Sequence, residues 1–205
     1  MRAVIRVDGS RLERYLERAK GDGRVAAARA LNRTMQTVQT RIAREVAADT
    51  GLPVRGILRA THLVRAGAEH LTAVVTLGTP RIVIADRAPS DEGRYFGLFF
   101  RGRQTAKGVS YRIGRRGRGF LRSAFLTTMR SGHRGMFVRL LPPHSRKGKP
   151  RSSPSLPIVQ KFGPSLPHVA RNIRADEITR DAERTILRKN LEHELRFLAQ
   201  RGGGA

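Results

Sequence analysis

A long acid-free segment constrains this chain more than any other feature of its sequence. Residues 93–175 contain no aspartate or glutamate, yet they hold 19 arginines and lysines out of a formal net charge of +25. Because like charges repel, such a segment is stable only when its cations are spread widely or covered by an anionic partner. The sequence therefore predicts a permanently bound anionic partner. The candidates are nucleic acid, an acidic protein surface and an anionic membrane.

The length of the chain favours one domain with appendages. Its 205 residues suffice to bury a core, but the apolar content of 39% is low, and tryptophan and cysteine are absent. We therefore expect part of the chain to pack against another molecule, and disulfides and thiolate metal sites are excluded. Without an apolar run of about 18 residues or an apolar centre in residues 1–8, we expect a soluble protein with no membrane contact.

Two long amphipathic helices are predicted near the ends of the chain, over residues 24–48 and 176–200. In both segments apolar residues recur every three or four positions. The first stripe consists of Leu31, Met35, Val38, Ile42 and Val46, and the second of Ile178, Ala182, Ile186, Leu191, Leu195 and Leu198. We expect both stripes to be core, so that aspartate at Leu31 or Leu195 destabilises the fold. Gly51 is the predicted C-terminal cap of the first helix.

Short strands are predicted between the helices, because aliphatic and β-branched segments alternate there with glycine and proline. The expected strands are residues 2–7, 60–66, 71–77, 81–85, 108–113, 120–127 and 135–141. A hairpin should join 108–113 to the segment 120–127 across the turn 114–119. Two short helices are expected, one over residues 12–20 and one from Pro53 to about residue 59.

Residues 142–168 contain seven prolines among serine, lysine, arginine and glycine, a composition that disfavours both helix and sheet interiors. This pattern predicts an extended, basic, Pro-rich arm. The fold class is therefore α+β, with a small, mostly antiparallel sheet and two long amphipathic helices. We expect a body over residues 1–141, the arm over 142–168, and a C-terminal helix over 169–205 that packs back on the body.

No arrangement of residues in the sequence indicates catalysis, a metal or a cofactor. The six histidines lack ligand spacing, and the carboxylates gather in the two helical ends of the chain. The string Gly-Arg-Arg-Gly-Arg-Gly at 114–119 lacks the Gly-Lys-Ser/Thr ending of a phosphate-binding loop and is interpreted as a basic hairpin tip. An enzyme such as a nuclease would need an acidic metal cluster, which the pattern does not offer.

The candidate interaction residues form a basic group and an apolar group. Arg115, Arg116, Arg118 and Arg134 have no acid nearby in sequence and are expected to reach a partner. The apolar group lies in the arm, where too little local structure is expected to bury it against its own chain. It consists of Leu156, Ile158, Phe162, Pro164 and Leu166. Tyr111 and Phe120 beside the arginines would also suit stacking on bases, so charge by itself does not separate phosphate from an acidic protein.

Three strings of the sequence resemble the minor tail protein Z family of long-tailed bacteriophages and prophages. They are Ala-Leu-Asn-Arg-Thr at 30–34, the block 108–139 with Met-Arg-Ser-Gly-His-Arg-Gly at 129–135, and the block 156–168 with Gly-Pro-Ser-Leu-Pro at 163–167. The strings occur in the family's order, and the resemblance runs from about residue 24 to the C-terminal helix. The basic segment 144–153 is longer than the family pattern leads us to expect.

The resemblance implies a virion structural protein of the tail and neck that completes the head-proximal end of the tail for head–tail joining, with no catalytic residues. It implies a homo-oligomeric ring, six-fold in symmetry, in contact with the tail terminator, the tail tube and connector rings, and assembly in the host bacterial cytoplasm. Because exposed arginines would hold sliding DNA, we place the basic face against acidic neighbours or outside the tube. The alternative is a basic nucleic-acid-binding protein that holds the DNA end in the virion.

Overall fold

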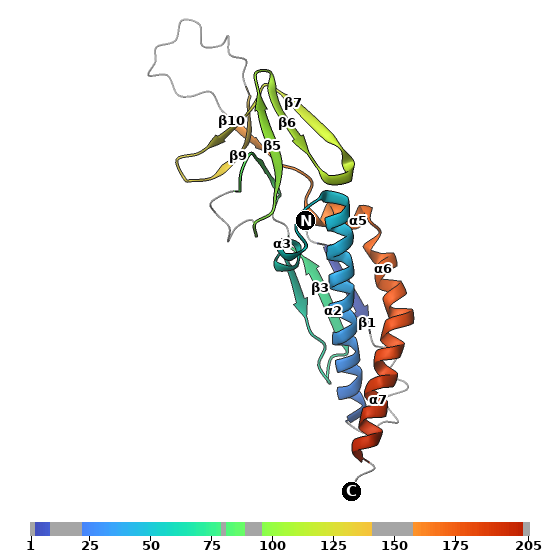
Figure 1. Ribbon diagram of the computed structural model, residues 1–205. Coiled ribbons are helices and arrows are strands. Elements are labelled where there is room, and N and C mark those ends of the chain that lie inside the picture. Colours follow the sequence, from blue (N-terminus) through green and yellow to red (C-terminus); the bar gives the residue numbers. More distant parts are fainter. Residues whose placement is uncertain (1–2, 9–21, 79–80, 89–95, 141–157, 203–205) are drawn as a thin grey trace, which may run out of the picture.

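The computed structural model describes residues 3–8, 22–78, 81–88, 96–140 and 158–202. These residues form an elongated molecule with a helical half and a β-rich half (Figure 1). The predicted helix at 12–20 and the first part of the predicted arm lie outside the described residues. Within the described residues, helices and antiparallel strands are mixed, which confirms the α+β class.

Helix α2 (Asp22–Thr50) runs along the helical half and carries the first predicted stripe. All five stripe residues are buried, so this prediction is confirmed. The helix ends where Gly51 adopts a positive φ of 72° and donates its backbone N–H to the Ala47 carbonyl at 2.8 Å. Glycine takes this left-handed conformation without a Cβ penalty, so the predicted cap is also confirmed. The short helix α3 (Val54–Arg59) then begins after Pro53.

A three-stranded antiparallel sheet contacts α2. Its strands β1 (Ala3–Asp8), β2 (Thr61–Val64) and β3 (Thr72–Leu77) are ordered β1-β3-β2. Alternate residues of the central strand, Ala73, Val75 and Leu77, are buried, as the period of a half-buried strand requires. Helix α2 contacts both this sheet and the C-terminal helices, which makes α2 the centre of the helical half.

The C-terminal helices run antiparallel to α2 (Figure 1). They are α5 (Leu166–Asn172), α6 (Ala175–Ala182), the π-helical turn η3 (Glu183–Leu187) and α7 (Arg188–Gly202). A π turn adds one residue to the helical repeat and so rotates everything after it. After this turn, Glu194 is only 3% exposed and lies on the buried face, whereas Leu195 is 40% exposed. The prediction that Leu195 is a core position is therefore wrong.

The β-rich half contains two further sheets. Strands β4 (Val83–Ala85), β5 (Phe99–Thr105), β6 (Gly108–Arg112) and β7 (Arg118–Arg122) form a sheet in that order, in which only the β4–β5 pair is parallel. Strands β8 (Ala124–Thr128), β9 (Arg134–Arg139) and β10 (Ile158–Lys161) form the other, in the order β10-β9-β8. The strands of the described residues thus form three sheets, whereas the sequence predicts one small sheet.

Two strands were not expected from the sequence, and one predicted strand is divided. Strand β5 contains two arginines and a glycine, which hide its alternation, and β10 lies inside the predicted arm. The predicted strand 120–127 is split into β7 and β8 at Ser123, whose φ of 59° turns the chain. Because β10 pairs with β9 and α5 begins at Leu166, residues 158–168 belong to the folded body.

Candidate interaction surfaces

The tip of the β6–β7 hairpin packs on the end of the long helix α2. The tip contains the one-turn helix η1 (Gly114–Arg116), and Arg116 Nε donates to Asp49 Oδ2 at 2.8 Å. Gly114 has a φ of 42°, and a Cβ at this position would overlap the backbone of Asp49 and Thr50. Arg116 therefore has an intramolecular carboxylate partner, which the sequence did not indicate because Asp49 lies 67 residues earlier.

Arg134 is also satisfied within the chain. Its Nε and Nη2 donate to the two carboxylate oxygens of Asp86, both at 2.6 Å, and its Nη1 donates to Thr128 Oγ1 at 2.6 Å. The bidentate hydrogen bonds from Arg134 lower the pKa of Asp86, against a smaller opposing effect of burial. The pair links the start of β9 to the residue after β4, so we interpret Arg134 as a structural residue and not as a partner contact.

The Arg134–Asp86 pair gives a pH-dependent contribution to stability. Because the folded pKa of Asp86 is lowered from 3.8, the contribution is present above that pH and is lost as the pH falls through the folded pKa. We expect Arg134→Met to cost about 1 kcal/mol at pH 7, since Asp86 is partly exposed, and progressively less below pH 3.8. Urea unfolding at a series of pH values measures this, with the exposed Arg130→Met as control. A cost that does not change with pH would contradict the assignment.

Five other arginines form a surface that we call the arginine face. They are Arg101, Arg103, Arg112, Arg118 and Arg122, on alternate positions of β5, β6 and β7. The register places Arg112 opposite Arg118 and Ser110 opposite both Arg103 and Phe120. All five side chains are exposed, and none makes a hydrogen bond or ion pair with another described residue. Phe120, on the same face, is 51% exposed.

A groove of about 800 Å³ adjoins the arginine face, between the end of α2 and strand β5. The groove is lined by four arginines, Arg87, Arg101, Arg112 and Arg115. Asp86 is the acidic residue of the lining, and its carboxylate is already bound by Arg134. The groove is therefore strongly positive. Of the predicted basic residues, Arg115 and Arg118 remain available to a partner, and neutralising Arg116 together with them would also loosen the hairpin tip from α2.

The predicted apolar docking residues have different environments. Leu166 is fully buried in the chain's own core, so the expectation that local structure could not bury it is wrong. Phe162 forms a β-bridge with Val83 and lies beneath the Arg81 guanidinium, 5.5 Å from the ring centre, and Pro164 is half-buried. Ile158 remains exposed on the outer strand β10, whereas Leu156 lies outside the described residues.

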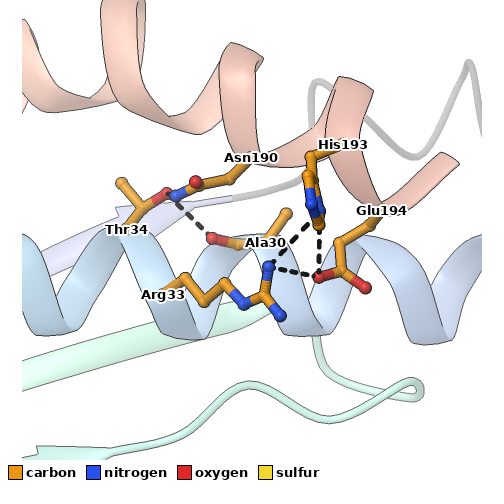
Figure 2. A network of polar contacts seen from close by, with 6 residues as sticks. All are labelled: Ala30, Arg33, Thr34, Asn190, His193 and Glu194. Carbon is orange, nitrogen blue, oxygen red and sulfur yellow. Dashed lines mark hydrogen bonds and ion pairs between the residues drawn. The ribbon is translucent and has the colours of Figure 1, made fainter. Parts of the chain in front are cut away.

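A polar network joins α2 to α7 (Figure 2). Arg33 Nη1 lies 2.8 Å from Glu194 Oε1 and 3.4 Å from His193 Nδ1. One turn away, Asn190 Nδ2 donates to Thr34 Oγ1 at 3.0 Å, and this hydroxyl donates to the Ala30 carbonyl at 2.8 Å. Paired polar groups in an otherwise apolar seam fix the register of the two helices. Apart from the Ala-Leu-Asn-Arg-Thr string, no pattern in the sequence indicates this network.

The described residues contain no group of three or more histidines and carboxylates that could hold a metal ion. Among the same residues, no helix has both the length and the apolar character needed to cross a membrane. The exposed chemistry of the described part of the chain consists mainly of arginines without partners and of open strand edges.

A fold with this exposed chemistry is that of a structural interaction protein. The sequence model of the prophage minor tail protein Z family matches residues 14–201, so the chain belongs to this family of structural phage tail proteins. The match includes all three strings on which the resemblance was based. No curated protein and no solved structure matches the chain. Membership places the protein in the virion tail, in contact with other tail proteins.

Proposed function

We propose that this protein completes the head-proximal end of the phage tail and prepares it for joining to the filled head. The observation that carries the proposal is the family match over residues 14–201. The surfaces support an assembly role, because arginines without intramolecular partners and open strand edges are available to bind a partner. The proposed neighbours are the tail terminator, the tail tube and the connector rings.

The proposed form is a homo-oligomeric ring of six-fold symmetry that assembles in the host cytoplasm. A ring needs two different surfaces on each subunit, one for each neighbour. The elongated fold offers such surfaces at separate places, since the arginine face lies in the β-rich half and α7 ends the helical half (Figure 1). The basic face is placed against acidic neighbours and not along the DNA channel.

Loss of this protein is expected to leave tails of normal length that fail to give infectious particles. The physical reason is that a completion protein acts after the tube has polymerised. The test is a nonsense codon at Asp22 of the encoding gene, with particles counted by electron microscopy and by plaque titre, and we expect the titre to fall by orders of magnitude.

The matched control for this experiment supplies the protein from a plasmid, which should restore the titre. Tails of abnormal length in its absence would contradict the proposal and indicate a measuring or terminating role. Normal titre without the protein would also contradict it.

A second function is favoured by one observation, the exposed ring of Phe120 among the unpaired arginines. Arginines that neutralise phosphates and an aromatic ring that stacks on bases are the usual elements of a nucleic-acid surface. In this function the chain holds the DNA end in the virion. Purified protein would then bind random duplex DNA with a steep salt dependence.

A further inference from the structure

Strand β7 is the outer strand of its sheet. The order β4-β5-β6-β7 leaves one side of β7 without a neighbouring strand among the described residues, and Figure 1 shows β7 along the outer side of the hairpin. A strand edge of this kind presents unpaired backbone donors and acceptors, and natural proteins usually prevent further pairing there with proline, charges or a covering segment. The sequence of β7, Arg-Gly-Phe-Leu-Arg, contains no proline.

The hydrogen bonds that flank β7 show which of its backbone groups point outward. Ile113 N donates to the Gly117 carbonyl and Ser123 N to the Lys107 carbonyl, both at 3.0 Å. In an antiparallel pair the hydrogen-bonded positions alternate, so Gly119 and Leu121 bond to β6. The N–H and C=O groups of Arg118, Phe120 and Arg122 consequently point away from the sheet.

The same three residues place their side chains on the arginine face. Arg118 and Arg122 are exposed cations on either side of the half-exposed Phe120 ring. The opposite face packs on the body, since Gly102 and Val109 are buried and Gly102 lies beside Ile84 and Leu126. A strand that paired with β7 would therefore meet two cations and one aromatic ring at alternate positions, about 7 Å apart along the strand.

The positions of the two arginines disfavour pairing of β7 with the β7 strand of a second copy. In an antiparallel pairing of two β7 strands centred on Phe120, Arg118 of each copy would lie opposite Arg122 of the other. Like charges directly opposite one another destabilise a strand pair. A different partner strand would fit better. With Asp or Glu opposite Arg118 and Arg122, it would form two ion pairs, and an aliphatic residue opposite Phe120 would cover the aromatic ring.

We propose that β7 is a docking edge for an extended acidic segment of another tail protein, which adds as a fifth strand to the sheet β4-β5-β6-β7. Backbone hydrogen bonds supply the affinity in this mode of recognition, and alternate side chains supply the specificity. The proposal goes beyond tail completion and does not depend on where in the tail the chain sits. Peptide binding by the purified protein therefore tests the docking edge, and the phage phenotype tests tail completion. Either proposal can be refuted while the other is confirmed.

The test uses the full chain and a synthetic peptide that contains Glu-Thr-Ile-Thr-Glu flanked by threonines, with a lysine-for-glutamate peptide as control. Amide hydrogen exchange is followed by NMR. We expect the acidic peptide to slow exchange at Arg118, Phe120 and Arg122 at least tenfold. Exchange at Gly119 and Leu121, which are already bonded to β6, should remain unchanged.

Four variants separate the contributions of backbone, ring and charge. Phe120→Pro removes an outward N–H together with the aromatic ring, whereas Phe120→Leu removes the ring alone. The proline variant should weaken peptide binding at least tenfold relative to the leucine variant, without disturbing the β6–β7 pairing. The double variant Arg118→Glu/Arg122→Glu should lose the acidic peptide and bind the lysine peptide instead. The matched control Arg130→Glu, between β8 and β9, should bind like the parent.

Unchanged amide exchange at Arg118, Phe120 and Arg122 in the presence of bound peptide would overturn the proposal. So would peptide binding that is undiminished in both Phe120→Pro and the double arginine variant. Random duplex DNA serves as a second probe. DNA binding that is lost in the double arginine variant, without any binding of the acidic peptide, would make the arginine face a phosphate surface and refute the docking edge.

Discussion

Replacement of Leu31 by aspartate should lower the free energy of unfolding by about 4 kcal/mol, because it places an unpaired carboxylate in a fully buried position. Leu31 lies on α2, in the core that this helix shares with the first sheet and the C-terminal helices. The same change at Leu195, which is 40% exposed, should cost less than about 1 kcal/mol. Urea unfolding of the two variants measures the difference.

The Leu195→Asp variant is the matched control, since both sites are leucines in long helices with the same apolar spacing. Equal losses at the two positions would contradict the exposed position of Leu195 and restore the sequence-based assignment of both stripes to the core.

Removal of Arg33 should have the second largest effect. Glu194 is buried at 3% exposure, and Arg33 Nη1 lies 2.8 Å from its Oε1 (Figure 2). Arg33→Met would leave a buried carboxylate without its main cation, which typically costs 3–5 kcal/mol. We expect about 2 kcal/mol here, because Arg33 itself is half-exposed and water can partly replace it.

A double-variant cycle tests this reading of the Arg33–Glu194 pair. Replacing both residues, as in Arg33→Met/Glu194→Leu, should recover most of the lost stability, since a buried ion pair and an apolar pair of similar size are often equivalent. Additive losses in the double variant would show that the pair is not coupled. Arg188→Met, which removes an exposed ion pair of α7, is the control and should cost less than about 0.5 kcal/mol.

The elements with strong local signals could be predicted from the sequence. The stripe of α2, its glycine cap and the alternation of β3 depend on contacts between residues a few positions apart, and all three are present. Strand β5 could not be found in this way, because its arginines and Gly102 conceal the period of a strand whose buried side is defined by distant residues of β4, β6 and β8.

The candidate site could be predicted only in part. Arg115 and Arg118 are exposed as expected, whereas Arg116 and Arg134 pair with Asp49 and Asp86. These carboxylates lie 67 and 48 residues away along the chain, so no local pattern could have indicated them. The arginine face could not be predicted either, because its five arginines come from three strands whose register the sequence does not specify.

The sequence by itself determined the α+β class, the long helix α2, the acid-free character of the middle segment and the family, since each depends on composition, local period or short strings. Tertiary structure decided which arginines remain free, that residues 158–168 join the body, and that Glu194 and not Leu195 faces α2. The reason is that partners for buried and charged groups are chosen by packing between distant segments, and one added residue in a π turn changes the face a helix presents.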